Sequence, residues 1–245
     1  MGKIDNLYLK VYGLICGEHP NLRPLHYQWL AANVLYADLR RIIPDLHGHI
    51  LDVGCGDKPY QTWFQHVESY IGIDVYDGPH VDKVIYPGQA WPLSDAAFDA
   101  IFCTQVLEHI SDLDHVLSEM KRVLKPGGTL VVTAPFVYHE HLRPHDYRRS
   151  SVHGIRQFFE NDYEIVLVKS QGRIGNTLGL LFLNWITVAS YQSLLTRIMM
   201  GLAMPLWIIF CTLVNGMAVL LNLLDSTGAF YSNVLLVARK RQSVS

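Results

Sequence analysis

The feature that most constrains this chain of 245 residues is the segment 50–60, ILDVGCGDKPY. It opens with apolar residues and continues with an acid and two glycines, so we expect a buried strand that ends in a tight loop. Glycine has no Cβ, so Gly54 and Gly56 would let a ligand approach the backbone closely. A second apolar segment, 71–76 (IGIDVY), ends near Asp74, whose carboxylate can accept hydrogen bonds from both ribose hydroxyls. Together the two segments predict a nucleoside site in an α/β fold.

The acidity of this loop argues against a dinucleotide ligand. Asp52 precedes the glycines and Asp57 follows them, and Pro59 stands where the G-x-G-x-x-G fingerprint of dinucleotide-binding proteins needs its third glycine. A pyrophosphate binds best to uncluttered backbone amides at the start of a helix. Carboxylates suit a ligand with an ammonium or sulfonium group instead. A nicotinamide oxidoreductase is therefore the weaker alternative.

Four motifs, in the expected order, resemble those of the class I S-adenosylmethionine-dependent methyltransferases, in particular the small-molecule branch of that family. They are LDVGCGDKPY, GIDV, WPLSDAAFDAIFCTQVLEHI and EMKRVLKPGGTLVVTAPF, and they fall within residues 50–136. The chain departs from the family at Lys58, where a third glycine is common, so the loop is expected to differ locally in shape. The resemblance implies S-adenosylmethionine as cofactor. The implied cofactor-binding residues are Asp52, Gly54, Gly56, Asp74, Val75, Gln89, Ala90 and Gln105.

From residue 49 on, apolar segments alternate with helical ones, which predicts a Rossmann-like, doubly wound α/β sheet. The resemblance adds that the sheet is mostly parallel with an antiparallel last strand. We expect strands at 49–53, 70–74, 98–103, 128–134, 163–169 and 232–238. Helices are expected at 24–43, near 59–66, and at 111–124 and 150–160. In a parallel sheet of this kind the ligand lies outside the carboxyl ends of the strands.

An apolar block interrupts this pattern and accounts for a mean hydropathy of +0.15. Between Arg173 and Asp225 the only charged residue is Arg197. We expect two helices joined near residues 197–201, inserted between the last two strands. The predicted domains are an N-terminal helical cap at 1–48, a methyltransferase domain at 49–171 and 229–245, and an apolar helical insertion at 172–228.

Uncharged runs of about 20 residues are candidates for membrane spans, so residues 174–224 predict contact with a membrane surface. The polar residues within them favour a hairpin that dips into one leaflet; these are Asn184, Gln192, Asn215 and Asn222, together with Pro205. The alternatives are a helix pair that covers the sheet and a dimer interface. Both ends of the hairpin return to the catalytic domain, so the number of crossings is zero or two. The protein is expected in the cytoplasm, on the cytosolic face of the membrane. A net charge of −2 gives no electrostatic case for a nucleic-acid partner.

Histidines near the predicted site are candidates for removing a proton from the methyl acceptor. His109 follows the strand at 98–103, and His141, His145 and Asp146 lie in a polar segment after the strand at 128–134. Three arginines of the same region, Arg143, Arg148 and Arg149, could hold a phosphate or carboxylate. His139, His141 and His145 match no strong zinc signature, so no metal is expected.

The sequence thus predicts a methyltransferase that uses S-adenosylmethionine, with an oxygen of a small-molecule, sugar or lipid-linked acceptor as its target. The histidines favour oxygen because they offer a base. The alternative is a catalytically silent, membrane-docked scaffold that keeps the cofactor fold.

Overall fold

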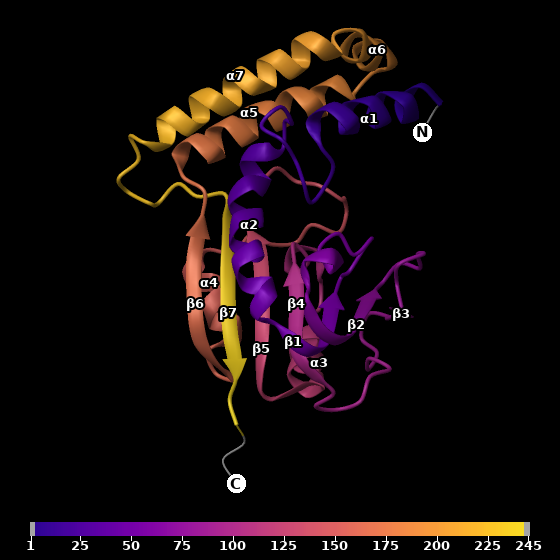
Figure 1. The fold of residues 1–245 in the computed structure, drawn as a ribbon, viewed down its shortest axis with the longest axis vertical. Helices are drawn as coiled ribbons and strands as arrows, with labels where there is room; N and C mark the ends of the chain where they lie inside the picture. The colour runs from indigo at the N-terminus through magenta and orange to yellow at the C-terminus, as the bar shows by residue number, and fades with distance from the viewer. Residues whose placement is uncertain (1–2, 243–245) are drawn as a thin grey trace. The chain divides into compact units, whose positions relative to one another are not determined.

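A computed structural model describes residues 3–242, and its centre is a sheet of seven strands in the order β3-β2-β1-β4-β5-β7-β6 (Figure 1). The strands are β1 (His47–Val53), β2 (His66–Asp74), β3 (Lys83–Val84), β4 (Phe98–Thr104), β5 (Leu124–Pro135), β6 (Tyr163–Gln171) and β7 (Asn233–Lys240). Strands β1 to β5 pair in parallel, and β7 is antiparallel to β5. This arrangement confirms the predicted fold class.

The register of the sheet sets where its ends meet. Pro135, the last residue of β5, pairs with Asn233, the first of β7. Strand β7 therefore starts at the edge where the parallel strands end. Its arrow in Figure 1 runs opposite to that of its other neighbour, β6. The carboxyl ends of β1, β2, β4 and β5 lie at this same edge.

The chain divides into two compact units, each described by itself. The sheet unit comprises residues 38–136 and 140–170 and the chain from 233 on, and the helical unit comprises residues up to 37, 137–139 and 171–232. Two helices lie wholly in the sheet unit, α3 (Leu113–Val123) and α4 (Val152–Phe159). The helical unit holds α1 (Lys3–Cys16), the first part of α2 (Trp29–Ile42), α5 (Ile174–Ser190), α6 (Leu194–Leu202) and α7 (Met204–Asn222). The N-terminal segment and the apolar insertion thus belong to one unit.

Two predicted helices differ from those observed. The helix expected at 59–66 is wrong: a 3-10 turn, Gln61–Trp63, stands there, because the backbone from His66 on pairs with β1. The helix expected at 24–43 starts only at Trp29. Asn215 of α7 donates to the carbonyls of Pro24 and His26, which holds that segment in turns.

The apolar insertion has three helices and not two. Residues 197–201, where the turn was expected, lie inside α6. Ser193 accepts a hydrogen bond from the amide of Thr196 and so caps α6. Pro205 lies in the first turn of α7, where proline is tolerated, and does not interrupt that helix.

The helical unit packs closely through glycines and asparagines. A Cβ on Gly175 of α5 would lie 1.9 Å from the carbonyl oxygen of Ala218 on α7. Glycine there lets the two helices approach, as in the small-xxx-small packing of membrane helices. Gly179, four residues further on, faces Ala218 and Leu30 in the same way. Asn222 of α7 donates to Asn176 of α5 at 2.6 Å.

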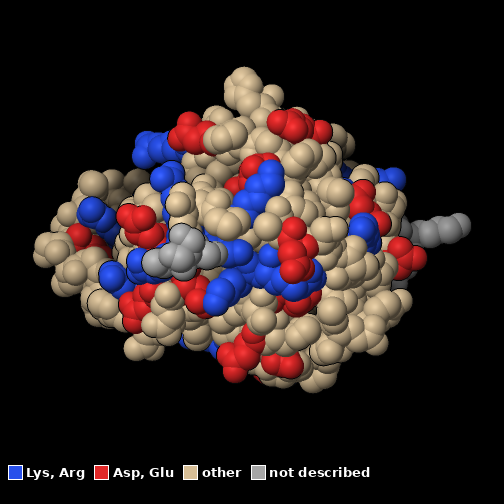
Figure 2. Space-filling model, turned by 90° about the horizontal axis from the view of Figure 1, so that it is seen from below, with Lys and Arg blue, Asp and Glu red and all other residues tan. Residues whose placement is uncertain are grey.

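Charged side chains of the sheet unit are mostly paired. Lys121 and Asp162 lie 2.6 Å apart, and Lys125 and Asp99 lie 2.7 Å apart. On the face of the molecule seen in Figure 2, basic and acidic side chains are interspersed. That face therefore offers no broad region of one sign.

Candidate active site

The glycine loop after β1 takes the backbone conformation that its sequence predicts. Gly54 and Gly56 have φ angles of +69° and +49°, in the left-handed region that favours glycine. The amides of Gly54 and Cys55 donate to the carbonyl of Ile73 on β2, which anchors the loop to the sheet. A Cβ on Gly56 would meet nothing within 4 Å. The backbone of the loop is therefore open to a ligand on that side.

Lys58 takes the place of the family's third glycine and keeps its backbone shape. Its φ is +52°, a conformation that costs a side-chain-bearing residue about 1–2 kcal/mol. The ammonium group pairs with Asp82 and lies 5.7 Å from the centre of the Tyr70 ring. Gly72 on β2 makes room for this side chain, since a Cβ there would lie 2.4 Å from Cε of Lys58. Lys58 thus has a backbone conformation that glycine favours, and Gly72 accommodates its side chain.

The two acids at the strand ends differ in environment. Asp52 is buried at the end of β1 and accepts a hydrogen bond from the Tyr70 hydroxyl. Burial raises the pKa of Asp52 to about 7, although Tyr70 and Lys58 oppose the rise. Asp74, at the end of β2, accepts from the amide of Gly56 at 3.0 Å and from the amide of Tyr76 at 3.2 Å. Asp74 therefore organises the loop, and its contact with the ribose stays a prediction.

The remaining predicted cofactor residues also follow strands of the sheet unit. Val75 comes directly after β2 and is exposed, as are Gln89 and Ala90 in the loop after β3. His115 of α3 contacts the carbonyl of Gln89 at 2.9 Å. Gln105 follows β4 with a φ of +56°. Its amide donates to Thr133 and Asn233, which fixes it between β5 and β7.

These residues fit the cofactor that the sequence predicts. The fit rests on three observations: a glycine loop with an open side, a buried carboxylate at Asp52, and a second carboxylate at the end of the next strand. Such carboxylates suit a cationic methionyl group and a ribose. The assignment of individual residues to parts of the cofactor stays a prediction.

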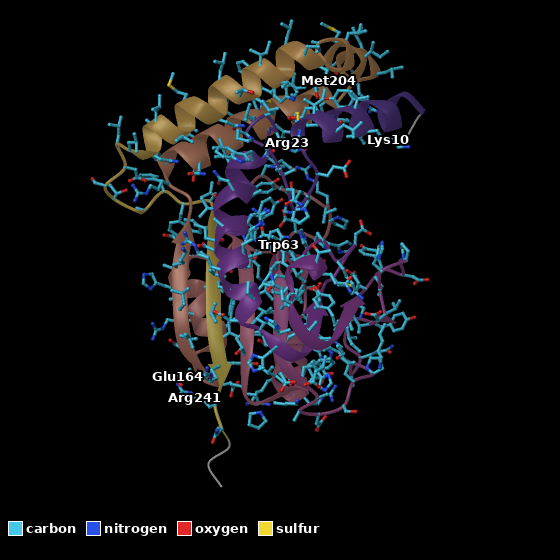
Figure 3. All side chains as sticks on the ribbon, in the orientation of Figure 1. Lys10, Arg23, Trp63, Glu164, Met204 and Arg241 are labelled. Carbon is cyan, nitrogen blue, oxygen red and sulfur yellow. The ribbon has the colours of Figure 1, made fainter. Side chains whose placement is uncertain are left out.

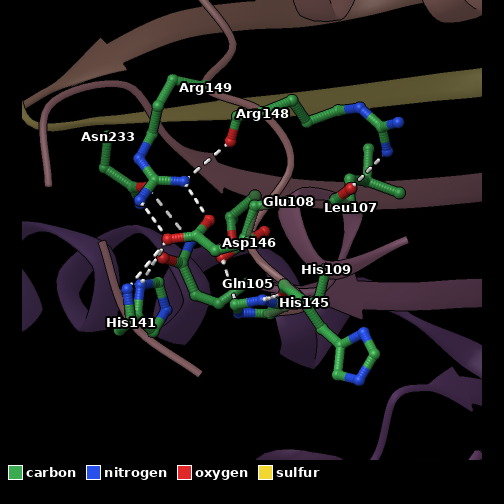
Figure 4. Close-up of polar contacts among 11 residues, drawn as sticks. Gln105, Leu107, Glu108, His109, His141, His145, Asp146, Arg148, Arg149 and Asn233 are labelled. Atoms are coloured by element: carbon green, nitrogen blue, oxygen red, sulfur yellow. Dashed lines mark hydrogen bonds and ion pairs between the residues drawn. The ribbon is translucent and has the colours of Figure 1, made fainter. Parts of the chain in front are cut away.

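Two imidazoles face each other beyond Gln105. His109 lies in the 3-10 turn Leu107–His109, and His141 lies on the loop after β5. Their ring centres are 4.7 Å apart and the rings are nearly perpendicular (Figure 4). Nδ1 of His109 lies 2.6 Å from the carbonyl oxygen of His145, and Nδ1 of His141 lies 3.3 Å from Oδ2 of Asp146. Backbone and carboxylate contacts thus orient both rings.

Asp146 and Arg149 form a buried pair behind His141. Arg149 donates to both carboxylate oxygens of Asp146, at 2.5 and 2.7 Å. These hydrogen bonds hold the pKa of Asp146 well below its usual range, although burial opposes them. Asp146 therefore stays ionised and positions His141, rather than taking a proton itself.

The structure does not bring every predicted residue into this cluster. The ring of His145 is exposed and contacts the hydroxyl of Tyr147, so His145 contributes only its carbonyl. The three arginines proposed for phosphate are engaged within the protein. Arg143 pairs with Glu140, Arg148 donates to the carbonyls of Leu107 and Ile110, and Arg149 holds Asp146.

Glu108 is a member of the cluster that the sequence did not single out. It is 1% exposed, and burial raises the pKa of its carboxyl to about 7. Its Oε1 lies 3.8 Å from Nε2 of His109. The sequence feature that could have identified Glu108 is its position next to a histidine in the motif QVLEHI, directly after a strand that ends at the ligand edge of the sheet.

Comparison with known proteins identifies the same kind of domain in the sheet unit. The methyltransferase domain family matches residues 51–132. The chain carries a class I S-adenosylmethionine-dependent methyltransferase domain. It is 46% identical to a probable S-adenosylmethionine-dependent methyltransferase of Mycolicibacterium smegmatis, over 55% of this chain and 56% of the relative. S-adenosylmethionine, the predicted cofactor, is thereby confirmed as that of the family.

Two further comparisons show that the methyltransferase domain alone does not identify the reaction or the acceptor. A tRNA U34 carboxymethyltransferase of Saccharophagus degradans is 36% identical over 38% of this chain and 35% of its own length. The chain therefore spans about a third to a half of the length of these curated relatives. The [4+2]-cyclase SpnF has the same fold, with a TM-score of 0.57 and 21% identity over 88% of this chain and 84% of its own. Different reactions share this domain, so the acceptor must be sought in this chain's own residues.

Proposed function

We propose that this protein transfers a methyl group from S-adenosylmethionine to an oxygen of a small-molecule, sugar or lipid-linked acceptor at or near a membrane surface. The observation that carries the choice of oxygen is the facing pair His109 and His141, next to Gln105. A hydroxyl acceptor must lose its proton, and imidazole is the side chain best suited to accept it near neutral pH.

Each residue of the site has a separate task in this reaction. Bound S-adenosylmethionine supplies an electrophilic methyl group, and the electron pair of the broken carbon–sulfur bond stays on sulfur. Asp52 and Asp74 hold the cofactor's charged and hydroxyl groups. His109 or His141 accepts the acceptor's proton, and ionised Asp146 stabilises the cationic ring of His141 across the 3.3 Å contact.

The membrane part of the proposal rests on the outer surface of the helical unit. Figure 3 shows few nitrogen or oxygen tips along α7, which starts at the labelled Met204. Large apolar side chains stand exposed on all three helices of the insertion: Leu178, Phe182, Trp185 and Val188 of α5, Leu194, Leu195, Ile198, Met199 and Leu202 of α6, and Leu206, Ile209, Leu213, Met217 and Leu220 of α7. A continuous apolar surface of this kind needs a partner.

The interior of the same unit supports a bilayer as that partner. Asn176 and Asn215 are 2% and 1% exposed, and both donate hydrogen bonds inside the unit. Polar groups therefore turn inward while apolar groups turn outward. A hydrocarbon surrounding favours polar groups that bond inside the protein, as the amides of Asn176 and Asn215 do, although Nδ2 of Asn184 and Oδ1 of Asn215 have no hydrogen-bond partner among the described residues. Asn215 and Asn222, two of the polar residues that interrupt the uncharged runs, donate hydrogen bonds within the unit.

The helix lengths are close to the thickness of a bilayer core. Among the described residues, Met204–Asn222 is the one helix long and apolar enough to cross a membrane, and Ile174–Ser190 is a shorter apolar one. Nineteen residues of α7 extend about 28 Å, against roughly 30 Å of hydrocarbon. We therefore place the insertion in the cytosolic leaflet or across the membrane in two passes, with the cofactor site in the cytoplasm.

Vesicle flotation tests the membrane part. The protein is mixed with vesicles of phosphatidylcholine and phosphatidylglycerol and centrifuged through a density gradient. Wild-type protein should float, and the triple variant Leu206→Glu, Leu213→Glu, Met217→Glu should remain at the bottom. The matched control, Val166→Glu with Leu167→Glu on exposed positions of β6, should float like the wild type. If the triple variant floats as well as the control variant does, the membrane part of the proposal is wrong.

A further inference from the structure

We propose that Glu108, His109 and His141 bind a divalent transition-metal cation beside the predicted cofactor site. Each of the three side chains offers one ligand atom, and the three atoms lie within 4.8 Å of one another. The sequence led us to expect no metal, because the spacing of His139, His141 and His145 matches no strong zinc signature. The fold instead joins a turn after β4 to a loop after β5.

The carboxylate of Glu108 is the observation that calls for a cation. Its side chain is 1% exposed, and neither oxygen has a hydrogen-bond partner among the described residues. The nearby guanidinium of Arg149 donates to both oxygens of Asp146, and its charge only partly opposes the effect of burial on Glu108. A buried carboxylate in this state needs a proton or a metal.

Both histidines are held in the way that metal-binding histidines usually are. Such a residue commonly gives its second ring nitrogen to a backbone carbonyl or a carboxylate, which fixes the ring. His109 uses the carbonyl of His145, at 2.6 Å, and His141 uses Asp146, at 3.3 Å. Asp146 is in turn fixed by Arg149. Contacts within the protein thus fix the orientation of His109 and His141, two of the three proposed ligands.

The spacing and chemistry of the ligands indicate the class of metal. Bonds of about 2.0–2.2 Å in a tetrahedral site place ligand atoms roughly 3.3 Å apart. Oε1 of Glu108 and Nε2 of His109 are 3.8 Å apart, and all three ligand atoms lie within 4.8 Å of one another, so each distance must shorten by about 1.5 Å or less to close the site. Two imidazoles and one carboxylate suit zinc and its first-row neighbours. Three protein ligands leave a further position for a small molecule.

The consequence for the reaction rests on the proposed function. An acceptor hydroxyl bound at the open position would have its pKa lowered by the cation and release its proton to solvent water. His109 and His141 would then act as ligands and not as the base. The oxygen would be held near Gln105, which lies three residues before Glu108.

Metal binding can be measured without any methyl acceptor. Purified protein is stripped with a chelator and titrated with Zn²⁺ against a chromophoric competitor, and separately with Co²⁺ while its visible absorption is recorded. About one equivalent of each should bind, with Co²⁺ bands of low coordination number. Glu108→Gln, His109→Ala and His141→Ala should each weaken binding at least about tenfold, and Asp146→Asn about 10- to 100-fold.

His145→Ala is the matched control, because its ring lies outside the cluster on the same loop, and it should bind like the wild type. Circular dichroism shows whether each variant is folded, and Glu108→Gln keeps the shape of the side chain. Absence of binding, or binding that the three ligand variants leave unchanged, would overturn the site. Metal binding without methyl transfer would leave the site standing and remove the proposed function. Full methyl transfer by stripped protein would overturn the catalytic role given to the cation and leave the methyl transfer intact.

Discussion

The two units of this protein distribute polarity in opposite ways. In the sheet unit the strands are apolar inside, and the polar side chains gather at the edge where the parallel strands end, as Gln105 and Asp74 do. In the helical unit Asn176, Asn184 and Asn215 are buried, while many large apolar side chains of α5, α6 and α7 are exposed. The first pattern is that of a water-soluble enzyme, and the second is that of helices in hydrocarbon. The contrast is the reason why we propose a membrane surface as the partner of the helical unit.

The exceptions within the sheet unit are as informative as the pattern. Asp52, Glu108 and Asp146 are carboxylates buried near the ligand edge. Asp146 is fully paired, whereas burial raises the pKa of Asp52 and of Glu108 to about 7. Buried acids with raised pKa values concentrate where ligands bind. Buried polar side chains thus mark both the candidate site, where they are carboxylates, and the helical unit, where they are asparagines.

The largest expected effect is the dependence of the free energy of unfolding on pH that Asp52 causes. Its folded pKa of about 7 lies above the unfolded value of 3.8, so the folded state binds the proton more tightly. The stabilisation is complete below pH 3.8 and is lost as the pH rises to about 7, which corresponds to on the order of 4 kcal/mol. Urea unfolding from pH 4 to 8 should show this fall in the wild type, relative to Asp52→Asn. Parallel curves for the two proteins would contradict it.

The next effect tests helix packing in the helical unit. Gly175→Ala would place a methyl group against the carbonyl of Ala218, which must move. Overpacking of this kind costs typically 1–3 kcal/mol, and we expect about 3 because the neighbour is backbone. The free energy of unfolding in detergent micelles measures the loss. A variant as stable as the wild type would mean that α5 and α7 do not pack as described.

A somewhat smaller effect is expected for the cofactor. Asp74→Ala removes the acceptor for the amides of Gly56 and Tyr76 and the partner of the ribose. Binding of S-adenosylmethionine should weaken by about 1.5–3 kcal/mol, measured by calorimetry. Asp77→Ala, at a neighbouring exposed acid, serves as control. Unchanged affinity in Asp74→Ala would take this residue out of the site.

The smallest effect separates packing from helix propensity. Gly216 of α7 faces open space, since a Cβ there would meet nothing within 4 Å. Gly216→Ala should therefore stabilise the helix by up to about 1 kcal/mol, the opposite sign to Gly175→Ala. The same unfolding assay compares the two. Destabilisation by Gly216→Ala would indicate that this face is packed against something.

The sequence predicted what depends on consecutive residues. The strands around segment 50–60, the tight glycine loop and the cofactor class follow from local patterns of a few residues each. The apolar block could also be recognised in the sequence, because it contains almost no charged residues. These features needed no knowledge of which distant residues touch.

What the sequence did not predict depends on contacts between distant segments. The helix expected at 59–66 is absent because β1 takes the backbone from His66 on, and the late start of α2 depends on Asn215, about 190 residues away. Glu108 was not singled out in the sequence, and only the fold brings His141 near it. Pairwise contacts of this kind leave no periodic signal in the chain.

The central claim is that a methyltransferase domain serves an acceptor at a membrane. Its most direct test is transfer of a labelled methyl group from S-adenosylmethionine into a total membrane-lipid extract, reconstituted in vesicles, and in parallel into a water-soluble extract. We predict label in the lipid fraction, lost in the His109→Ala, His141→Ala double variant even though that variant still binds the cofactor. Label confined to the water-soluble fraction, or no label in either, would contradict the account.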